Sequence, residues 1–562
     1  MKTVLQEIQV IHKKNLKFFK EKIPELYKKI VSFSIPETEK AKTGLPTLKK
    51  NGRYVHSVYD PVHESENIFK NSGYRNQKNV IFLGIGAGYP LLPFLSIEEK
   101  KRLLIVEEKP EFLNLSFKIV DYERLFSIHD CVIKTGDEVP DFSQLLNKEE
   151  PSEIFVFEHP VLTKDNDFYN KTKNAFRLFL KNLSAEFNTT GYFSFCWFKN
   201  SILNLTKVPQ SFDLLSIKET FKGYPAAIVS AGPSLERSID LLKSIKEKNI
   251  VIISASSSFN RLIKANITPH FVVTTDGGFY SSWNTRNGIN DNRIILTGDL
   301  STHHDFIPIK HHRYCFFDFG LNFSEIFIDT KNLLPKFTMG GTVTSSCLEL
   351  AVFLGCNRLI LFGQDFGFPW QTAHCRGTIH EKWGLITSNR TEPFETLETK
   401  RVFSESLHIE EDYNNQKVKT SSKHLLYRDW FSKKWKGTYT ASKYSIKTDG
   451  IIYGIPDLSN FNGKDPFEII NKNLKPLNFT GIRKDAMKNI LSFKDAIENS
   501  KNIEELFQRI DPEISYSIRQ ALLLEIKRSN GILTNELKSR LKRCLRILMS
   551  VLNFFNRDSI RD

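Results

Sequence analysis

The sequence predicts an α/β protein, and three observations support this. Between residues 225 and about 370, six short apolar runs alternate with helical stretches, which is typical of a mostly parallel sheet with helices on both faces. A shorter series of the same kind lies between residues 79 and 160. From about residue 480 the apolar spacing becomes that of amphipathic helices. We therefore expect a Rossmann-like central domain, a smaller α/β domain before it and a helical region after it.

The predicted division has four parts. Residues 1–75 form a helical segment, 76–210 the smaller α/β domain, 215–455 the central domain and 456–562 a C-terminal helical domain. No apolar run reaches the ~20 residues that a membrane-spanning helix needs, and the first residues lack the apolar stretch of a signal peptide. We expect a soluble, cytoplasmic protein without a transmembrane segment.

The composition narrows the classes of partner. Lysine and arginine total 79 against 64 acids, a formal net charge of +15, so the surface should attract anions such as nucleotides or sugar phosphates. This charge is spread along the chain without basic runs that alternate with stacking aromatics, so we expect no nucleic acid as partner. Seven cysteines without a CxxC pair predict neither a disulfide framework nor a zinc site, and no metal ligands are assigned.

A glycine turn follows the first clear buried strand. The run Asn79–Leu83 leads into Gly84–Gly88, and the next apolar run ends in Glu107. An acid about 20 residues beyond the glycines is typical of dinucleotide-binding turns. However, Tyr89–Pro90 stands where the helix of such a turn normally begins. We interpret the turn as a structural likeness, and whether it binds a ligand is left open.

The central domain opens with a second strand-to-helix turn, Gly232-Pro233-Ser234-Leu235, here called the GPSL turn. Gly232 lets the backbone approach a ligand closely, and Pro233 suits the first position of a helix. Free N–H groups at a helix start attract phosphate, and Ser234 adds a hydroxyl. The alternative is a well-capped helix start without a ligand.

Polar side chains also stand at a later strand end and at a helix start. The strand at 271–276 ends in Asp276 and Gly277, where Asp276 is suited to hold a ribose hydroxyl or a metal ion, or alternatively to form a turn. The segment Gly340–Ser346 brings several hydroxyls to a helix start, where they either converge on a ligand or only cap the helix. The candidates there are Thr342, Thr344 and Ser345.

The last strand of the series, 358–363, ends in Gly363 and is followed by Asp365 and His374. A histidine is suited to general acid or base work because its ordinary pKa is about 6.5. The carboxyl ends of parallel strands meet at one edge of a sheet, so we expect Asp276 and Asp365 to face the same crevice as the GPSL turn. Together these strand ends predict a nucleotide-binding α/β enzyme.

Four segments together resemble the motility accessory factor family, which is linked to flagellin glycosylation. They are AAIVSAGPSLERSIDLLK, FVVTTDGG, GGTVTSSCLELAVFLGCNRLILFGQDFGF and TAHCRGT. The resemblance covers residues 80–455, and its central part is similar to bacterial sialyltransferases. It implies a transferase that moves a nonulosonic acid from its CMP-activated form to Ser or Thr of flagellin, for flagellar assembly and motility. No cofactor is required by that reaction, and magnesium is optional.

The resemblance also implies roles for single residues. The residues expected to hold the CMP phosphate are Gly232, Pro233 and Ser234, and those expected near ribose or phosphate are Ser256 and Asp276. The residues expected to line the cytidine pocket are Thr344, Ser345, Gly363 and Asp365. Gly277 and Thr342 are further donor-binding candidates. The sialyltransferase base is a histidine at a place where this chain has Lys419 and Thr420. The base is therefore open among His374, which matches a histidine of the motility family, His424 and Asp365.

Two other functions stay open from the sequence. The same central domain is shared with an archaeal hydroxymethylpterin pyrophosphokinase, in which the GPSL turn and the strand-end acids would serve ATP and magnesium. The other is a non-catalytic flagellin-binding chaperone. In either the transferase or the chaperone, the helical region from about residue 480 is the expected flagellin-binding surface.

Overall fold

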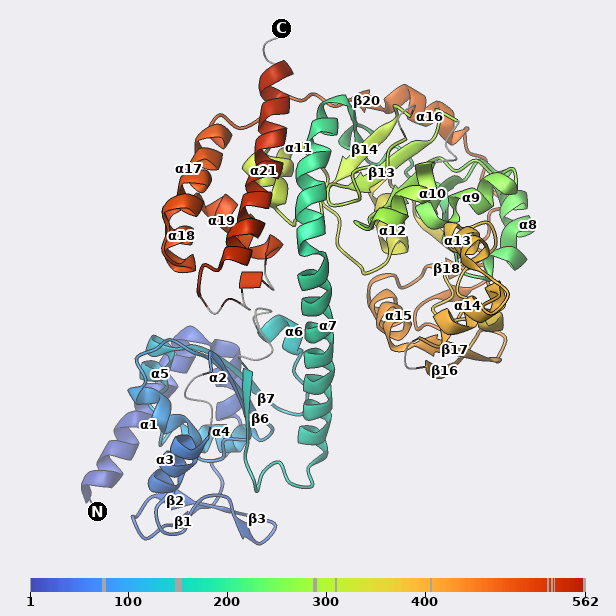
Figure 1. The fold of residues 1–562 in the computed structure, drawn as a ribbon. Coiled ribbons are helices and arrows are strands. Elements are labelled where there is room, and N and C mark those ends of the chain that lie inside the picture. Colours follow the sequence, from blue (N-terminus) through green and yellow to red (C-terminus); the bar gives the residue numbers. More distant parts are fainter. Residues whose placement is uncertain are drawn as a thin grey trace. The chain divides into compact units, whose positions relative to one another are not determined.

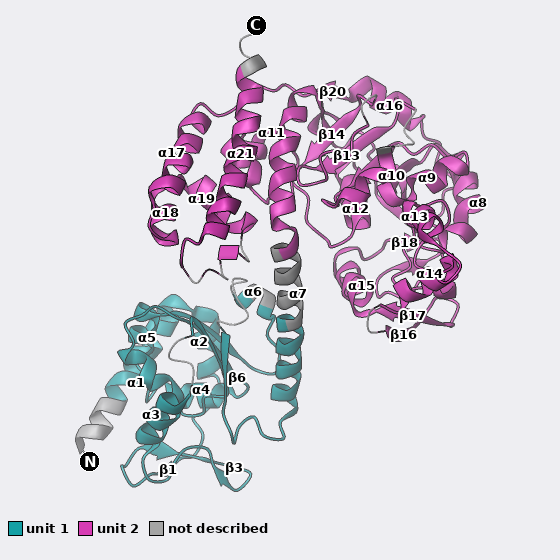
Figure 2. Cartoon of the chain, in the orientation of Figure 1, with its two compact units in different colours: residues 1–189 teal, residues 190–562 magenta. Residues whose placement is uncertain are grey.

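The computed structural model describes residues 2–558 except 73–76, 147–153, 287–290, 309–310, 405–406, 523–524, 527–528 and 530. The chain divides into two compact units, residues 1–189 (unit 1) and 190–562 (unit 2), and each is described by itself (Figure 1, Figure 2). One helix, α7 (Asp167–Asn204), begins in unit 1 and ends in unit 2. The predicted α/β class is confirmed, since both units contain parallel sheets.

Unit 1 is built on a four-stranded parallel sheet in the order β7-β6-β5-β8. The strands are β5 (Asn79–Leu83), β6 (Arg102–Glu107), β7 (Asp130–Thr135) and β8 (Ile154–Glu158). Every residue of β5 is buried, which is why this strand appears in the sequence as an unbroken apolar run. The three strands predicted here are confirmed, and β7 is a fourth that the pattern did not predict.

Helices and two short hairpins precede this sheet. The elements are α1 (Lys2–Lys22), α2 (Pro24–Val31), β1 (Glu39–Lys40), β2 (Pro46–Thr47), β3 (Lys49–Lys50), β4 (Arg53–Tyr54) and α3 (Pro61–Asn71). The Asp60 carboxylate accepts hydrogen bonds from the N–H groups of Val62 and His63, which caps α3. After β5 come η2 (Tyr89–Ser96), α4 (Pro110–Ser116), α5 (Tyr122–Ile128) and α6 (Phe142–Leu145).

Unit 2 contains a ten-stranded sheet in the order β19-β18-β15-β10-β11-β12-β13-β14-β9-β20. Its strands are β9 (Phe212–Asp213), β10 (Pro225–Val229), β11 (Val251–Ala255), β12 (Phe271–Thr274), β13 (Ile295–Asp299), β14 (Tyr314–Phe317), β15 (Arg358–Phe362), β18 (Tyr439–Thr440), β19 (Ile452–Tyr453) and β20 (Lys475–Pro476). Among the described strands of this sheet, β20 pairs antiparallel with β9 and the other pairings are parallel. The six predicted central strands are confirmed as β10 to β15. The strand order reverses between β10 and β15, so the point where ligands bind in such folds lies at their carboxyl ends.

Both faces of this sheet are covered. Ala226 and Ile228 of β10 pack in one apolar cluster with α12 (Val343–Phe353), whereas Ala227 and Val229 pack in another with α8 (Leu235–Lys246). Side chains of a strand alternate between faces, and here both faces are apolar because each carries a helix. The remaining elements before β15 are η4 (Leu205–Gln210), η5 (Leu214–Ile217), α9 (Ser256–Lys264), η6 (Phe279–Ser282), α10 (Trp283–Arg286), η7 (Phe323–Ile326) and α11 (Thr330–Leu333).

The stretch at 370–425, which has no long apolar run, is folded in its described parts. It contains η8 (Pro369–Gln371), α13 (Ile379–Thr387), α14 (Phe394–Val402) and a hairpin of β16 (Leu407–Glu411) with β17 (Lys417–Ser421), and α15 (Ser422–Lys434) follows. We call residues 366–434 the excursion. It leaves the sheet at β15 and returns to it at β18.

The C-terminal helices share a core with the sheet of unit 2. They are α16 (Pro466–Asn473), α17 (Ala486–Asn499), α18 (Ile503–Arg509), α19 (Pro512–Ala521) and α21 (Asn535–Asp558). Phe493 of α17 and Leu548 of α21 belong to the same buried cluster as Phe198 of α7 and Phe316 of β14. Removing residues from 480 onward would therefore expose this core as well as remove a surface. Among the described residues, no helix is long and apolar enough to cross a membrane.

Candidate functional site

The GPSL turn lies at the carboxyl end of β10, against the turn that follows β15. The Gly232 N–H donates to the Gly363 carbonyl at 2.8 Å. A Cβ atom on Gly232 would collide with that carbonyl and lie 2.6 Å from Asp365 Oδ2. Gly363 has a positive φ of 66°, which favours glycine. Both glycines are therefore required by the close packing of the two turns on each other.

Asp365 holds the GPSL turn. Its carboxylate accepts hydrogen bonds from the Ser234 N–H at 2.8 Å, from the Ser234 hydroxyl, and from the Ser445 hydroxyl at 3.1 Å. The residue is 3% exposed, and burial raises the pKa of Asp365 to about 6 against the opposing effect of these donors. The expectation that the GPSL turn offers free amides to a phosphate is therefore wrong for Gly232 and Ser234. Their N–H groups already donate to the Gly363 carbonyl and to the Asp365 carboxylate, and Pro233 has no N–H group.

The hydroxyls before α12 act mainly within the protein. Thr342 is the N-cap, whose Oγ1 accepts from the Ser345 N–H, and the Ser345 hydroxyl donates to the Thr342 carbonyl at 2.6 Å. The Thr344 hydroxyl lies 2.7 Å from that of Ser230, at the end of β10. The role of Thr342 is therefore the alternative given above, in which the hydroxyl caps the helix. Thr344 and Ser345 are buried, so their hydroxyls bind the chain itself.

The ends of the next two strands, β11 and β12, make fewer hydrogen bonds to the rest of the chain. Ser256 is the first residue of α9, directly after β11, and the N-cap is Ala255, so no side chain caps this helix. Asp276, after β12, is exposed, and its Oδ1 accepts from the Gly278 N–H at 2.8 Å. Asp276 thus forms a turn through Oδ1, as the alternative interpretation of this residue predicted. Its neighbour Gly277 has its carbonyl bonded by the Asn200 amide at 3.0 Å.

His374 lies in a segment that packs on the GPSL turn, since the N–H of the following residue, Cys375, donates to the Ala231 carbonyl at 2.8 Å. The His374 ring stacks on His380 of α13 with ring centroids 4.3 Å apart. Burial lowers the pKa of His374 to about 3, and the nearby His380, Arg401 and His424 lower it further. His374 is therefore neutral at ordinary pH and able to accept a proton, but a pKa this far below the working pH makes it a weak base.

His424, the second candidate base, is placed by α15. Its ring centroid lies 4.9 Å from that of Phe368 and 6.5 Å from that of Tyr427. Tyr427 in turn faces Gly341, at the start of the α12 turn. His424 affects the pKa of His374, so the two candidate bases lie near each other. In the described part of the chain, no three His, Cys, Asp or Glu residues are grouped so as to hold a metal ion.

Two features of the site were missed from the sequence. His380 follows His374 by six residues in the same polar segment, and this spacing is the only sequence signal for the pair. The other is a polar stripe on α7, where Asn200 donates to the carbonyls of Gly277 and Ser301, and Asn204 to those of Leu300 and Thr302. Asn200 and Asn204 stand four residues apart, a spacing that places them on one helix face.

In unit 1 the glycine turn after β5 is filled by the chain itself. Glu107 accepts from the N–H groups of Ile85 at 2.7 Å and Gly86 at 3.1 Å and from the Tyr169 hydroxyl at 3.1 Å. His56 Nε2 accepts from the Ala87 N–H at 2.9 Å. All of these groups are buried, and burial raises the pKa of Glu107. The geometry supports the structural interpretation of this turn.

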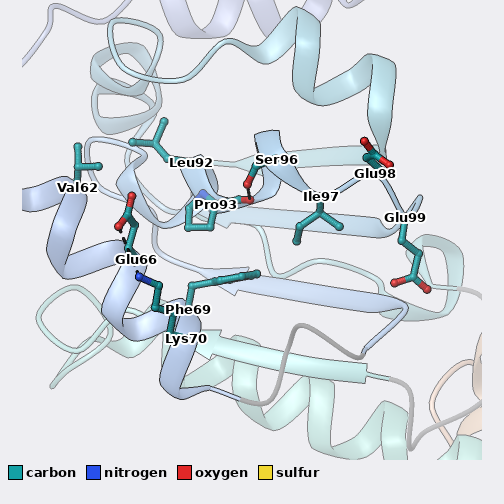
Figure 3. A pocket seen from close by; sticks show the side chains of 10 residues that line it. All are labelled: Val62, Glu66, Phe69, Lys70, Leu92, Pro93, Ser96, Ile97, Glu98 and Glu99. Carbon is teal, nitrogen blue, oxygen red and sulfur yellow. Dashed lines mark hydrogen bonds and ion pairs between the residues drawn. The ribbon is translucent and has the colours of Figure 1, made fainter.

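Unit 1 also has a surface pocket of about 760 Å³ between α3 and η2 (Figure 3). Val62 and Phe69 from α3 and Leu92 from η2 are among its apolar lining residues, and Glu66 pairs with Lys70 at 3.9 Å. Glu98 and Glu99 lie at the end away from Val62 (Figure 3). The pocket contains none of the predicted site residues.

Comparison with known proteins identifies two domains. Residues 7–168 match the glycosyltransferase Maf N-terminal domain, and residues 199–370 match the family described as 6-hydroxymethylpterin diphosphokinase MptE-like. An uncharacterized protein of Treponema pallidum (strain Nichols) is 37% identical over 57 residues, which is 10% of this chain and 14% of that protein.

A solved structure extends the likeness to the whole fold. The chain is similar to the MAf glycosyltransferase of Magnetospirillum magneticum AMB-1 with a TM-score of 0.63, over 98% of this chain and 97% of that one, at 12% sequence identity. At this identity the likeness concerns the fold. The two domain matches support a glycosyltransferase role.

Proposed function

This chain carries the Maf N-terminal glycosyltransferase domain together with an MptE-like domain, and we propose that it transfers a nonulosonic acid from its CMP-activated form to Ser or Thr of flagellin in the cytoplasm. The observation that carries the proposal is this combination of domains in one chain. A pyrophosphokinase would account for the second domain but gives no reason for the first.

The donor phosphate in this proposal binds at the start of α9 rather than at the GPSL turn. The GPSL amides are engaged, whereas the first turn of α9 has no side-chain cap. An uncapped helix N-terminus offers N–H groups and a partial positive charge to an anion. Ser256, the first residue of this helix, lies beside the strand-order reversal, and since its side chain is only 3% exposed the phosphate is held mainly by backbone N–H groups. The cytidine then lies toward β15 and the sugar toward β12.

His374 is the general base in this proposal. It is neutral because burial, and to a smaller extent its neighbours His380, Arg401 and His424, lower its pKa, and its segment packs directly on the GPSL turn. It would take the proton of the acceptor hydroxyl as that oxygen attacks the sugar carbon bonded to phosphate, while CMP leaves. Asp365 is a poorer candidate because its carboxylate already accepts hydrogen bonds from Ser234 and Ser445.

Calorimetry with CMP, CTP and ATP, each with and without magnesium, tests the function. We expect CMP to bind without magnesium. Binding of ATP with magnesium, and not of CMP, would instead indicate the pyrophosphokinase. Binding of none of the three, with flagellin still captured, would favour the chaperone. A mass spectrum of flagellin from a strain without this protein then reports the sugar and its attachment sites.

A further inference from the structure

Four aromatic side chains gather at the carboxyl edge of the sheet in unit 2, away from the GPSL turn. Phe279 and Tyr280 come from η6, Trp283 from α10 and Trp383 from α13. Ring centroids are 5.6 Å apart for Trp283 and Trp383 and 5.9 Å apart for Tyr280 and Trp383. We call these four residues the aromatic cluster. Through Trp383 it joins the excursion to the segment after β12, and Figure 1 shows α10 and α13 on that side of unit 2.

The cluster is not part of a core. Tyr280 is 64% exposed and Phe279 49% exposed, although large rings are among the side chains that gain most from burial. The indole N–H groups of Trp283 and Trp383 are buried and have no acceptor among the residues that the structure describes. A buried donor without an acceptor is costly, and such groups are rare unless something from outside the chain satisfies them.

A carboxylate stands beside these rings. Asp276 immediately precedes η6 and is exposed, and its Oδ2 has no hydrogen bond recorded within the described chain. Its charge reaches both His303, whose ring lies 5.6 Å from that of Phe279, and His380 of α13. Ring faces, two N–H donors and one carboxylate acceptor are thus brought together by elements about 100 residues apart in the sequence.

This set of groups suits a sugar. Ligand sites combine aromatic walls with a few placed polar groups; the rings can cover the C–H surface of a sugar, a carboxylate accepts bonds from hydroxyls, and indole N–H groups donate to hydroxyl or amide oxygens. A bare apolar peptide contact would need neither the carboxylate nor the indole donors.

The position is also that of a sugar bound to a nucleotide. In the sheet β12 is the second strand from β10, so at about 4.8 Å per strand its end lies about 10 Å along the carboxyl edge. We propose that the aromatic cluster and Asp276 bind the sugar part of the donor, with the nucleotide between α9 and the GPSL turn. This inference rests on the proposed function, and it adds the residues that select the sugar.

Calorimetry with two probes, CMP and CMP-N-acetylneuraminic acid, tests the inference on the full chain. We expect the wild type to bind the CMP-sugar more tightly than CMP. Trp383→Ala and Tyr280→Ala should each weaken CMP-sugar binding about tenfold or more and leave CMP binding unchanged. Tyr516→Ala, which removes a tyrosine that is 45% exposed on α19, is the matched control and should change neither.

Each outcome decides a different point. Unchanged CMP-sugar binding in both Tyr280→Ala and Asp276→Asn, which remove an exposed ring and an exposed charge, would overturn the inference. A raised KM for the acceptor with unchanged donor binding would assign the cluster to the acceptor polypeptide and would also overturn it. If the wild type binds neither probe, the proposed function fails first, and ATP binding in the same experiment shows which alternative replaces it.

Discussion

Both units of this protein place a glycine turn where the strand order of a parallel sheet reverses, and in both a carboxylate closes the turn. In unit 1 Glu107, at the end of β6, accepts from the N–H groups of Ile85 and Gly86. In unit 2 Asp365, after β15, accepts from the N–H and hydroxyl of Ser234. The two turns differ in what lies around them. His56 and Tyr169 complete the enclosure in unit 1, whereas in unit 2 the adjacent strand ends carry Ser256 at an uncapped helix and an exposed Asp276.

The comparison teaches that a glycine turn does not by itself make a ligand site. In each unit the glycines allow two segments to pack closely, and the carboxylate then satisfies the amides that a phosphate would otherwise take. The capacity to bind a ligand depends on what surrounds the turn: in unit 2 the next helix, α9, has no side-chain cap and Asp276 is exposed, whereas in unit 1 His56 and Tyr169 enclose the turn.

The largest effect is expected from removing the two carboxylates. Glu107→Ala and Asp365→Ala should each lower the free energy of unfolding by about 3 kcal/mol, because several buried donors lose their acceptor. Urea unfolding, followed by a probe in each unit, measures both. If the free energy of unfolding falls by less than about 1 kcal/mol at either position, that carboxylate does not stabilise its turn, and the two turns are not alike in this respect.

The same pair should differ in ligand binding. Glu107→Gln, which keeps an acceptor oxygen, should leave the affinity for CMP unchanged, whereas Asp365→Ala should weaken it by loosening the GPSL turn. If Glu107→Gln weakens CMP binding as much as Asp365→Ala, the turn in unit 1 is a ligand site after all.

The pH dependence of stability sharpens the role of Asp365. Its folded pKa of about 6 lies above the ordinary 3.8, so the folded state favours the protonated carboxyl. The resulting stability is fully present below pH ~4 and is lost as the pH rises through 6. This difference of pKa corresponds to about 3 kcal/mol at most. Relative to Asp365→Asn, the wild type should therefore lose up to that amount between pH 4 and pH 7. A constant difference across this range would contradict the raised pKa.

The sequence predicted the strands well because buried parallel strands are unbroken apolar runs. It also placed polar groups at strand ends, including Asp276 and Asp365. It did not show that the Gly232 and Ser234 amides were already engaged, because their acceptors are Gly363 and Asp365, about 130 residues away. Strand β7 was missed because most of its residues are only partly buried, so it carries little of the apolar signal.

His374→Ala should lower the rate of sugar transfer by about 10²-fold or more, the contribution of a positioned general base. CMP affinity should stay the same. Because the pKa of His374 is about 3, no fall in activity between pH 8 and pH 5 should come from its protonation. The matched variant is His424→Ala. If His424→Ala removes transfer and His374→Ala does not, the roles are exchanged.

Ser256→Asp should weaken CMP binding about tenfold, because a carboxylate at the start of α9 competes with the phosphate for the same N–H groups. The same change should also lower the stability somewhat, because Ser256 is only 3% exposed and the favourable interaction of an acid with the helix dipole offsets only part of the cost of burying a charge. Thermal unfolding separates the two effects. Unaltered CMP binding would place the phosphate elsewhere and would remove the main distinction between the two units.

The smallest effect is expected at Thr342, the N-cap of α12. Thr342→Ala should lower the free energy of unfolding by about 1 kcal/mol, the usual contribution of a capping hydroxyl, because the Ser345 N–H loses its acceptor. Thr342→Ser keeps the hydroxyl and should restore the stability. CMP affinity should be the same in all three proteins, since the cap satisfies a backbone group of the chain and no ligand. A loss of CMP affinity in Thr342→Ala, recovered in Thr342→Ser, would show that this hydroxyl does contact the donor. The donor-binding site of unit 2 would then extend from the starts of α9 and η6 to the start of α12.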